Sequence, residues 1–123
     1  MPARVSYIES MQCVQVEYLD DLSIGQLLGA LGDITLALRA HQSTRVLADC
    51  SGMVSGPTLI EIYEAVRGLL EVEETPSVRQ ALVLPSSTRA LDVVTFWETA
   101  SVNRGIDARS FTTRADALAW LTA

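Results

Sequence analysis

The chain has 123 residues, 49% of them hydrophobic, and a formal net charge of −6. This length suits one domain, and the apolar fraction is sufficient for a core without a supporting metal or disulfide. All nine Lys and Arg positions are arginines, scattered along the chain. Because nucleic acids bind clustered positive charge, we expect no nucleic-acid partner.

The sequence offers few ligands for a metal. Cys13, Cys50 and His41 lie far apart, whereas zinc sites use closely spaced Cys and His pairs. We therefore predict no metal site and no cofactor. The two cysteines are interpreted as free buried thiols, with a disulfide between them as the alternative. The chain shows no signal-peptide pattern and no apolar run near the ~20 residues that span a bilayer, which predicts a cytoplasmic protein without membrane contact.

The first elements are a hairpin and a helix. Apolar and polar residues alternate at 14–18, and a second extended run at 5–8 precedes them, which predicts two antiparallel strands. Ser23 and Gln26 then form a capping-box pattern at the start of a helix. Gly25 and Gly29 lie four residues apart in this helix and favour close packing against another backbone. Its apolar stripe is Ile24, Leu27, Leu28, Leu31, Ile34 and Leu38.

A buried strand at 45–49 leads to a second helix, which Thr58 and Glu61 are expected to cap. The buried face of this second helix is predicted to contain Leu59, Ile62, Tyr63, Val66, Leu69 and Leu70. Its wet face is predicted to contain Glu61, Glu64, Arg67 and Glu71.

Two more strands and two more helices complete the chain. Residues 81–84 form an apolar strand, and a helix beginning at Ser87 and Thr88 is closed by Gly105. That helix is expected to carry the apolar residues Leu91, Val94, Trp97 and Val102. A strand at 108–112 and a helix capped by Thr113 follow.

The order β-β-α-β-α-β-α-β-α predicts one α/β domain over residues 1–123. Its sheet is expected to be mostly parallel, with one antiparallel edge hairpin and right-handed crossovers.

Polar side chains gather where two predicted strands end, and ligands of open α/β sheets bind at such ends. Together with free helix N–H groups they predict a rim where an anion or a partner docks. The alternative is that these residues only form caps and turns. The predicted rim consists of Asp49, Cys50, Ser51, Ser55, Thr58, Ser86, Ser87 and Arg89.

Catalytic patterns are missing from the sequence. Cys50 follows Asp49 and is a candidate nucleophile, but His41 precedes its strand and is expected at the opposite end of the sheet. No Gly-x-Ser-x-Gly elbow and no phosphate-binding Gly-x-x-x-x-Gly-Lys loop occurs. We therefore predict that the protein is not an enzyme.

Three stretches resemble the SpoIIAA-like superfamily, which includes STAS domains and a STAS/SEC14-like group. Residues 45–52 (Arg-Val-Leu-Ala-Asp-Cys-Ser-Gly) are similar to its central strand. Residues 79–84 and the ending at 110–121, with its Ala-Leu-Ala-Trp-Leu helix, are similar to its closing half. The resemblance implies the fold described above.

The resemblance also implies a switch operated by phosphorylation. STAS proteins of the anti-sigma-antagonist type carry Asp-Ser-Ser-Gly, whose first Ser receives the phosphate. One alignment places Cys50 at that position and the other, which fits the helix start better, places Val54 there. Ser51 and Ser55 are the neighbouring candidate phosphoacceptors.

Two functions follow as hypotheses. The first is a non-catalytic bacterial regulatory or protein-interaction module that docks a protein partner or a second copy. A homodimer would cover the exposed edge strand at 5–8. The second is a carrier or sensor of a small apolar or anionic ligand, in a pocket lined by Phe96, Trp97 and Trp120.

Overall fold

The computed structural model describes residues 2–70 and 78–123, in which five strands form one sheet in chain order. The strands are β1 (Ala3–Ile8), β2 (Cys13–Asp21), β3 (Arg45–Ser55), β4 (Arg79–Val83) and β5 (Asp107–Phe111). The helices are α1 (Ile24–His41), α2 (Leu59–Leu70), α3 (Thr88–Asn103) and α4 (Arg114–Leu121), with a 3₁₀ turn, Glu9–Met11, inside the hairpin. β1 pairs with β2 antiparallel and the other pairs are parallel, so the predicted fold class is confirmed.

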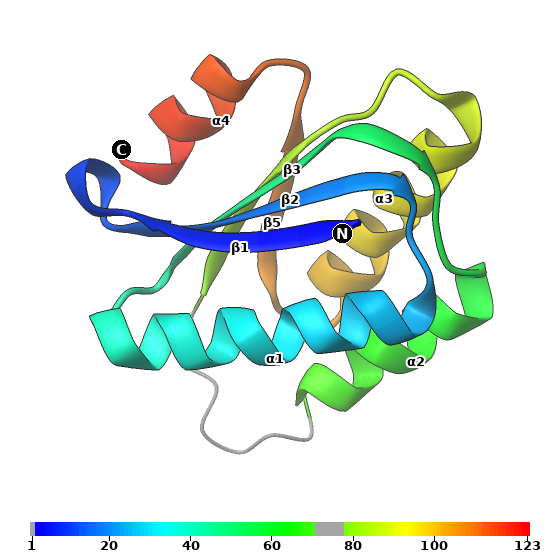
Figure 1. The fold of residues 1–123 in the computed structure, drawn as a ribbon, viewed down its shortest axis with the longest axis horizontal. Helices are drawn as coiled ribbons and strands as arrows, with labels where there is room; N and C mark the ends of the chain where they lie inside the picture. The colour runs from blue at the N-terminus through cyan, green and yellow to red at the C-terminus, as the bar shows by residue number, and fades with distance from the viewer. Residues whose placement is uncertain (1, 71–77) are drawn as a thin grey trace.

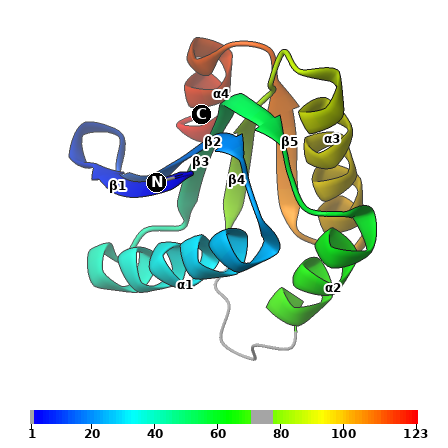
Figure 2. The ribbon, with the colours of Figure 1, turned by 45° about the vertical axis from the view of Figure 1, so that its right-hand side comes forward.

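The helices form two unequal layers, one on each face of the sheet. Because the strand order never reverses, right-handed crossovers place α1, α2 and α3 on the same face. Their buried residues share one core with Val14, Val16 and Val46. α4 packs on the opposite face, where Ala117 and Leu121 form a second core with strand residues. Figures 1 and 2 show α4 and α1 on opposite sides of the sheet.

The helix starts lie where the capping patterns place them. Ser23 N donates to Gln26 Oε1 at 2.8 Å, and Gln26 N donates to Ser23 Oγ at 3.2 Å. Thr58 and Glu61 make the same reciprocal pair, at 2.9 and 3.2 Å. These bonds satisfy backbone donors that have no partner within the helix, so a short sequence signal is enough to fix each boundary.

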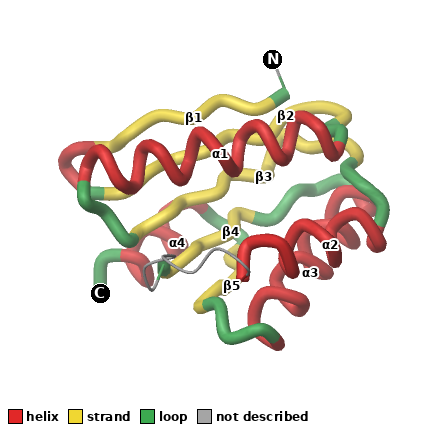
Figure 3. The backbone as a smooth tube through the Cα atoms, turned by 90° about the horizontal axis from the view of Figure 1, so that it is seen from below, coloured by secondary structure: helices red, strands yellow, loops and turns green. Residues whose placement is uncertain are grey.

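Helix α2 does not lie across the sheet as a regular crossover helix does. It packs on α3 and, to a lesser extent, on α1, as Figure 3 shows. Among its side chains that the structure describes, those of residues 59–68, the buried ones are accordingly Ile62, Ala65 and Val66. The prediction that Leu59 and Tyr63 are buried is therefore wrong, since they are 50% and 44% exposed.

Four of the residues named in the sequence prediction lie toward the ends of α2 and α3. The side chains of Leu69 and Leu70, and all of Glu71, lie outside the described residues. Val102, in the last turn of α3, is 52% exposed, and Ser101 occupies the buried position beside it.

The glycines of α1 lie on its solvent face, not against another backbone. A Cβ atom added at Gly29 or Gly32 would meet no atom within 4 Å, and one added at Gly25 would meet only Ser23 Oγ at 4.0 Å. The close packing predicted from Gly25 and Gly29 is therefore not found against residues 2–70 and 78–123 of the chain. Leu28 and Leu36 are exposed on the same helix, so this face is smooth and apolar.

We predict that Gly29→Ala and Gly32→Ala each raise the free energy of unfolding by about 0.5–1 kcal/mol, because Ala loses less backbone entropy in a helix and meets no obstacle here. Gly105→Ala is the opposing control. Its φ of 85° disfavours a side chain, so a loss of about 1–2 kcal/mol is expected. Urea denaturation measures all three, and a loss at Gly29 or Gly32 would contradict the open environment.

Candidate functional site

The predicted rim begins in a strand rather than in a loop. β3 continues from Asp49 to Ser55, because β2 also continues and supplies ladder partners. Leu19 pairs with Gly52 and Asp21 pairs with Ser55 across two register shifts. The sequence predicts that this strand ends at Asp49, because the Ser and Gly residues at 50–55 are typical of a loop.

Much of the rim's hydrogen-bonding capacity is used within the rim. Ser51 Oγ donates to Asp49 Oδ1 at 2.6 Å, and Ser55 Oγ donates to Asp21 Oδ1 at 2.7 Å. Ser87 caps α3, and its Oγ donates to Val54 O at 2.7 Å, which joins the end of β3 to the start of α3. The two carboxylates make this part of the rim unfavourable for an anion.

The remaining rim residues differ in exposure. Thr58 caps α2, Ser86 and Arg89 are exposed, and Cys50 is buried. The structure therefore brings the ends of β3 and the start of α3 together and turns Cys50 away from solvent.

Neither candidate phosphoacceptor lies at a helix N-terminus. Ser51 and Ser55 belong to β3, whereas α2 begins at Leu59 with Thr58 as its cap. Neither residue is therefore placed where free helix N–H groups would stabilise a phosphate. Each hydroxyl instead faces a carboxylate that would repel a phosphate.

The Cys50 thiol is held in its neutral form. It is 3% exposed, and burial, followed by the negative charge of Asp49, raises its pKa to about 12. Thiolates and not thiols are nucleophiles, so this group is unreactive near neutral pH. His41 ends α1 and stacks on Tyr7 with 3.7 Å between ring centroids, so it is committed to a different contact.

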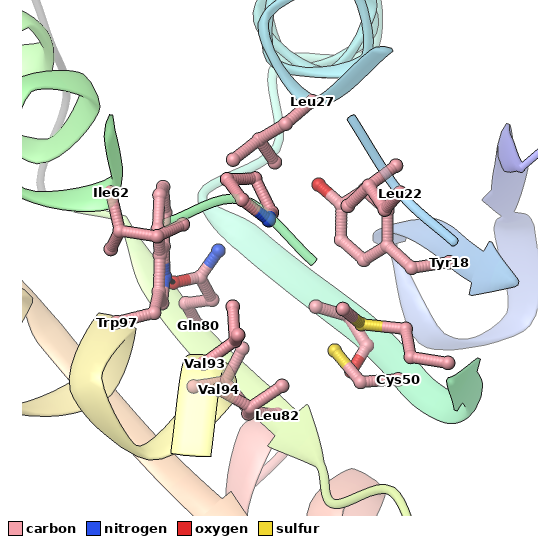
Figure 4. A pocket seen from close by; sticks show the side chains of 13 residues that line it. Tyr18, Leu22, Leu27, Cys50, Ile62, Gln80, Leu82, Val93, Val94 and Trp97 are labelled. Carbon is pink, nitrogen blue, oxygen red and sulfur yellow. Dashed lines mark hydrogen bonds between the residues drawn. The ribbon is translucent and has the colours of Figure 1, made fainter. Parts of the chain in front are cut away.

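An apolar cavity lies beneath α2, where the crossover helices leave a gap above the sheet. Its inner space is about 30 Å³, and the volume of about 390 Å³ counted out to its mouth includes open solvent. Its wall includes, from strands and then helices, Tyr18, Cys50, Leu82, Leu27, Ile62 and Trp97. Figure 4 shows these side chains converging from β2, β3, β4 and the three helices.

Only one of the three aromatic residues predicted to line a pocket does so. Trp97 lines the cavity, and its Nε1 donates to Gln80 Oε1 at 2.8 Å. Trp120 belongs to α4 on the opposite face, where it packs on Phe111 with ring centroids 5.6 Å apart. Phe96, one residue before Trp97, faces elsewhere on α3 and is absent from the wall.

Tyr18 and Gln80 contribute polar atoms to the cavity wall. Tyr18 is 6% exposed, and its hydroxyl makes no hydrogen bond with another described residue, although it is not one of the fully enclosed unpaired atoms, which are Gln15 Oε1 and Ser101 Oγ among the described residues. Burial and the adjacent Cys50 raise the pKa of Tyr18, so the hydroxyl keeps its proton and acts as a donor. Figure 4 shows this oxygen pointing inward, toward Leu27. In the sequence, Tyr18 is only the last residue of an alternating strand, and nothing in that pattern indicates a cavity beside it.

The outer surface of α2 is apolar in its first turns. Ile60 is 74% exposed, beside the exposed Leu59 and Tyr63. Arg104 lies over the ring of Tyr63 at 5.1 Å, and its Nη2 donates to the Tyr63 hydroxyl at 2.6 Å. We call Leu59, Ile60 and Tyr63 the α2 patch.

The described residues, 2–70 and 78–123, hold no group of three His, Cys, Asp or Glu side chains that could bind a metal ion. The same residues contain no helix that is both long and apolar enough to cross a bilayer.

A five-stranded sheet with one antiparallel edge, three helices on one face and a closing helix on the other defines a SpoIIAA-like fold. The chain is similar in structure to an uncharacterized protein of the DUF3478 family with a SpoIIAA-like fold from Shewanella loihica PV-4. The TM-score is 0.59 at 17% sequence identity, over 97% of this chain and 91% of that chain. No known family profile and no curated protein matches the sequence.

We predict that Tyr18→Phe leaves the ligand-free protein as stable as the wild type, or more stable by up to about 1 kcal/mol. The hydroxyl makes no hydrogen bond with another described residue, and Phe fills the same space without a polar group that folding must desolvate. Tyr7→Phe, on β1, is the control and is expected to change little. Urea denaturation gives both values, and a loss above about 1 kcal/mol for Tyr18→Phe would show that its hydroxyl is already bonded.

Proposed function

We propose that this domain is a non-catalytic, cytoplasmic regulatory module of the bacterial STAS-like type, which docks a protein partner through the α2 patch and the adjoining rim. The observation that carries this proposal is the exposure of three large apolar side chains at the start of α2. Isolated apolar residues are common on surfaces, but a contiguous group beside polar residues is typical of interaction sites.

The α2 patch has the composition of an interface centre. Tyr and Arg are enriched among the residues that dominate binding, and Tyr63 and Arg104 are already held together here. The rim that precedes α2 supplies hydroxyls and carboxylates, as the polar margin of an interface does. Rim and patch are continuous in the chain, because only Gly56, Pro57 and Thr58 separate β3 from α2.

A phosphorylation switch remains part of this proposal through Ser51 and Ser55. A phosphate on either hydroxyl would replace its hydrogen bond to Asp49 or Asp21 with repulsion. Such a modification would rearrange the rim, and the partner's affinity would change with it.

We predict that Ile60→Asp abolishes capture of the partner by the tagged protein from its native cytoplasm. A charge forced into an apolar interface has no compensating partner, so a loss of at least about tenfold is expected. Ala119→Asp is the matched control, since Ala119 is exposed on α4, on the opposite face of the sheet. Quantitative mass spectrometry of captured proteins is the readout. If Ile60→Asp captures the same proteins as the wild type, the docking site does not include the α2 patch. Arg89→Glu tests the contribution of the rim separately.

The partner can also be a second copy of the chain. β1 is an edge strand: one of its edges pairs with β2, and no strand of the described sheet pairs with the other. α1 packs against β1 and turns Leu28, Gly29 and Gly32 outward. A two-fold axis perpendicular to the sheet would pair β1 with its copy and bring the two apolar faces of α1 to the same side. One interface would thus cover both features.

We predict a homodimer that Ser6→Lys converts to monomer, because Lys on an edge strand opposes pairing with another strand. Ser10→Lys, in the neighbouring turn, adds the same charge outside β1 and is expected to leave the dimer intact. Native mass spectrometry at micromolar concentration measures both. A wild-type monomer, or a dimer unaffected by Ser6→Lys, would exclude this interface.

A second function, the holding of a small ligand as a carrier or sensor, is favoured by one observation. The cavity beneath α2 is lined mainly by apolar side chains, together with the Tyr18 hydroxyl and the Gln80 side-chain amide. Ligand sites commonly combine an apolar wall with a few such polar groups.

A further inference from the structure

We propose that the cavity beneath α2 binds a small neutral molecule with an apolar body and one hydrogen-bond acceptor, which the Tyr18 hydroxyl recognises. This inference rests on the second function proposed above and names the chemical class of its ligand. It narrows the apolar or anionic ligand expected from the sequence to a neutral one.

The charge of the ligand follows from the wall of the cavity. None of the described residues that line it is Asp, Glu, Lys or Arg. An ion moved into such a site would lose its hydration without gaining a counter-charge. The negative charge of Asp49 acts on Cys50 in the wall, where it raises the pKa of the thiol, and it would oppose an anion further.

The single acceptor follows from the donors that are free. The amide oxygen of Gln80 is occupied by Trp97, and the Cys50 thiol makes only a weak contact with Ala48 O at 3.8 Å. Two donors in the wall make no hydrogen bond with a described acceptor, the Tyr18 hydroxyl and the Gln80 Nε2 amide, and Tyr18 is the more buried of the two residues. A carbonyl oxygen has two lone pairs, so one bound acceptor can take the Tyr18 hydrogen bond and still serve Gln80. The apolar body would contact side chains such as Leu82 and Ile62.

The size of the ligand follows from the space. Benzene fills a cavity of about 150 Å³, whereas the inner space of this cavity is about 30 Å³ and the larger volume of about 390 Å³ includes open solvent at the mouth. A flat or slender molecule would therefore enter from the mouth, and side chains of the wall would move apart to admit it. We therefore choose substituted benzenes as probes.

The test uses acetophenone, which is neutral and has one acceptor, and ethylbenzene, which has a similar shape without the oxygen. Benzoate is the anionic comparison. The chain has two tryptophans, and only Trp97 lines the cavity, so their indole N–H signals in NMR report binding and contain an internal control. Binding in the cavity shifts the Trp97 signal and leaves that of Trp120 unchanged.

We expect acetophenone to bind the wild type about fivefold more tightly than ethylbenzene, and benzoate not to shift Trp97. Tyr18→Phe is expected to remove the preference for acetophenone without weakening ethylbenzene, whereas Tyr7→Phe is expected to preserve it. Equal binding of both neutral probes to wild type and Tyr18→Phe would overturn the ligand class but retain a cavity that binds ligands. No shift of Trp97 with any probe would overturn the cavity as a site, and with it the second function. Preferential binding of benzoate would overturn the inferred neutrality.

Discussion

The order of the strands governs the arrangement of the rest of this structure. The five strands lie side by side in chain order, so every parallel connection must cross in the same sense and on the same face. Three helices therefore share one face of a sheet in which β4 and β5 have only five residues each. α1 and α3 lie against the strands, and α2 packs on those two helices instead. The cavity and the α2 patch both result from this position.

The two faces of the sheet are covered by different kinds of contact. The face under α1, α2 and α3 has a large aliphatic core with a gap beneath α2. The face under α4 is covered by eight helical residues, and its margin uses cation–aromatic contacts. Arg79 and Arg109 lie 4.7 and 5.7 Å from the ring centroid of Trp120, and Arg79 Nη1 also donates to Trp120 O. Aromatic residues that look equivalent in the sequence thus have unrelated surroundings, which is why Trp97 and Trp120 could not be assigned to one pocket.

Local signals in the sequence predicted the elements well. The pairs Ser23–Gln26 and Thr58–Glu61 determine helix starts through bonds within a single turn, and a single turn is what a sequence pattern can encode. Features that depend on a distant partner were harder to predict. β3 extends to Ser55 because β2 extends beside it, and Tyr63 is exposed because α2 lies on helices rather than strands. The candidate site has both kinds of feature. The rim was predicted from the ends of single strands, but the cavity could not be predicted, because it depends on how α2 packs against α1 and α3.

The two proposed functions use opposite faces of the same helix. Ile62 points into the cavity, and Ile60, two residues earlier, points to solvent. Since successive helical residues are separated by about 100°, these two side chains lie roughly 200° apart around α2. A substitution at Ile60 therefore changes the surface without entering the wall of the cavity, and a substitution at Tyr18 changes the cavity from the opposite side. Docking and ligand binding can consequently be disrupted one at a time, although both depend on where α2 sits.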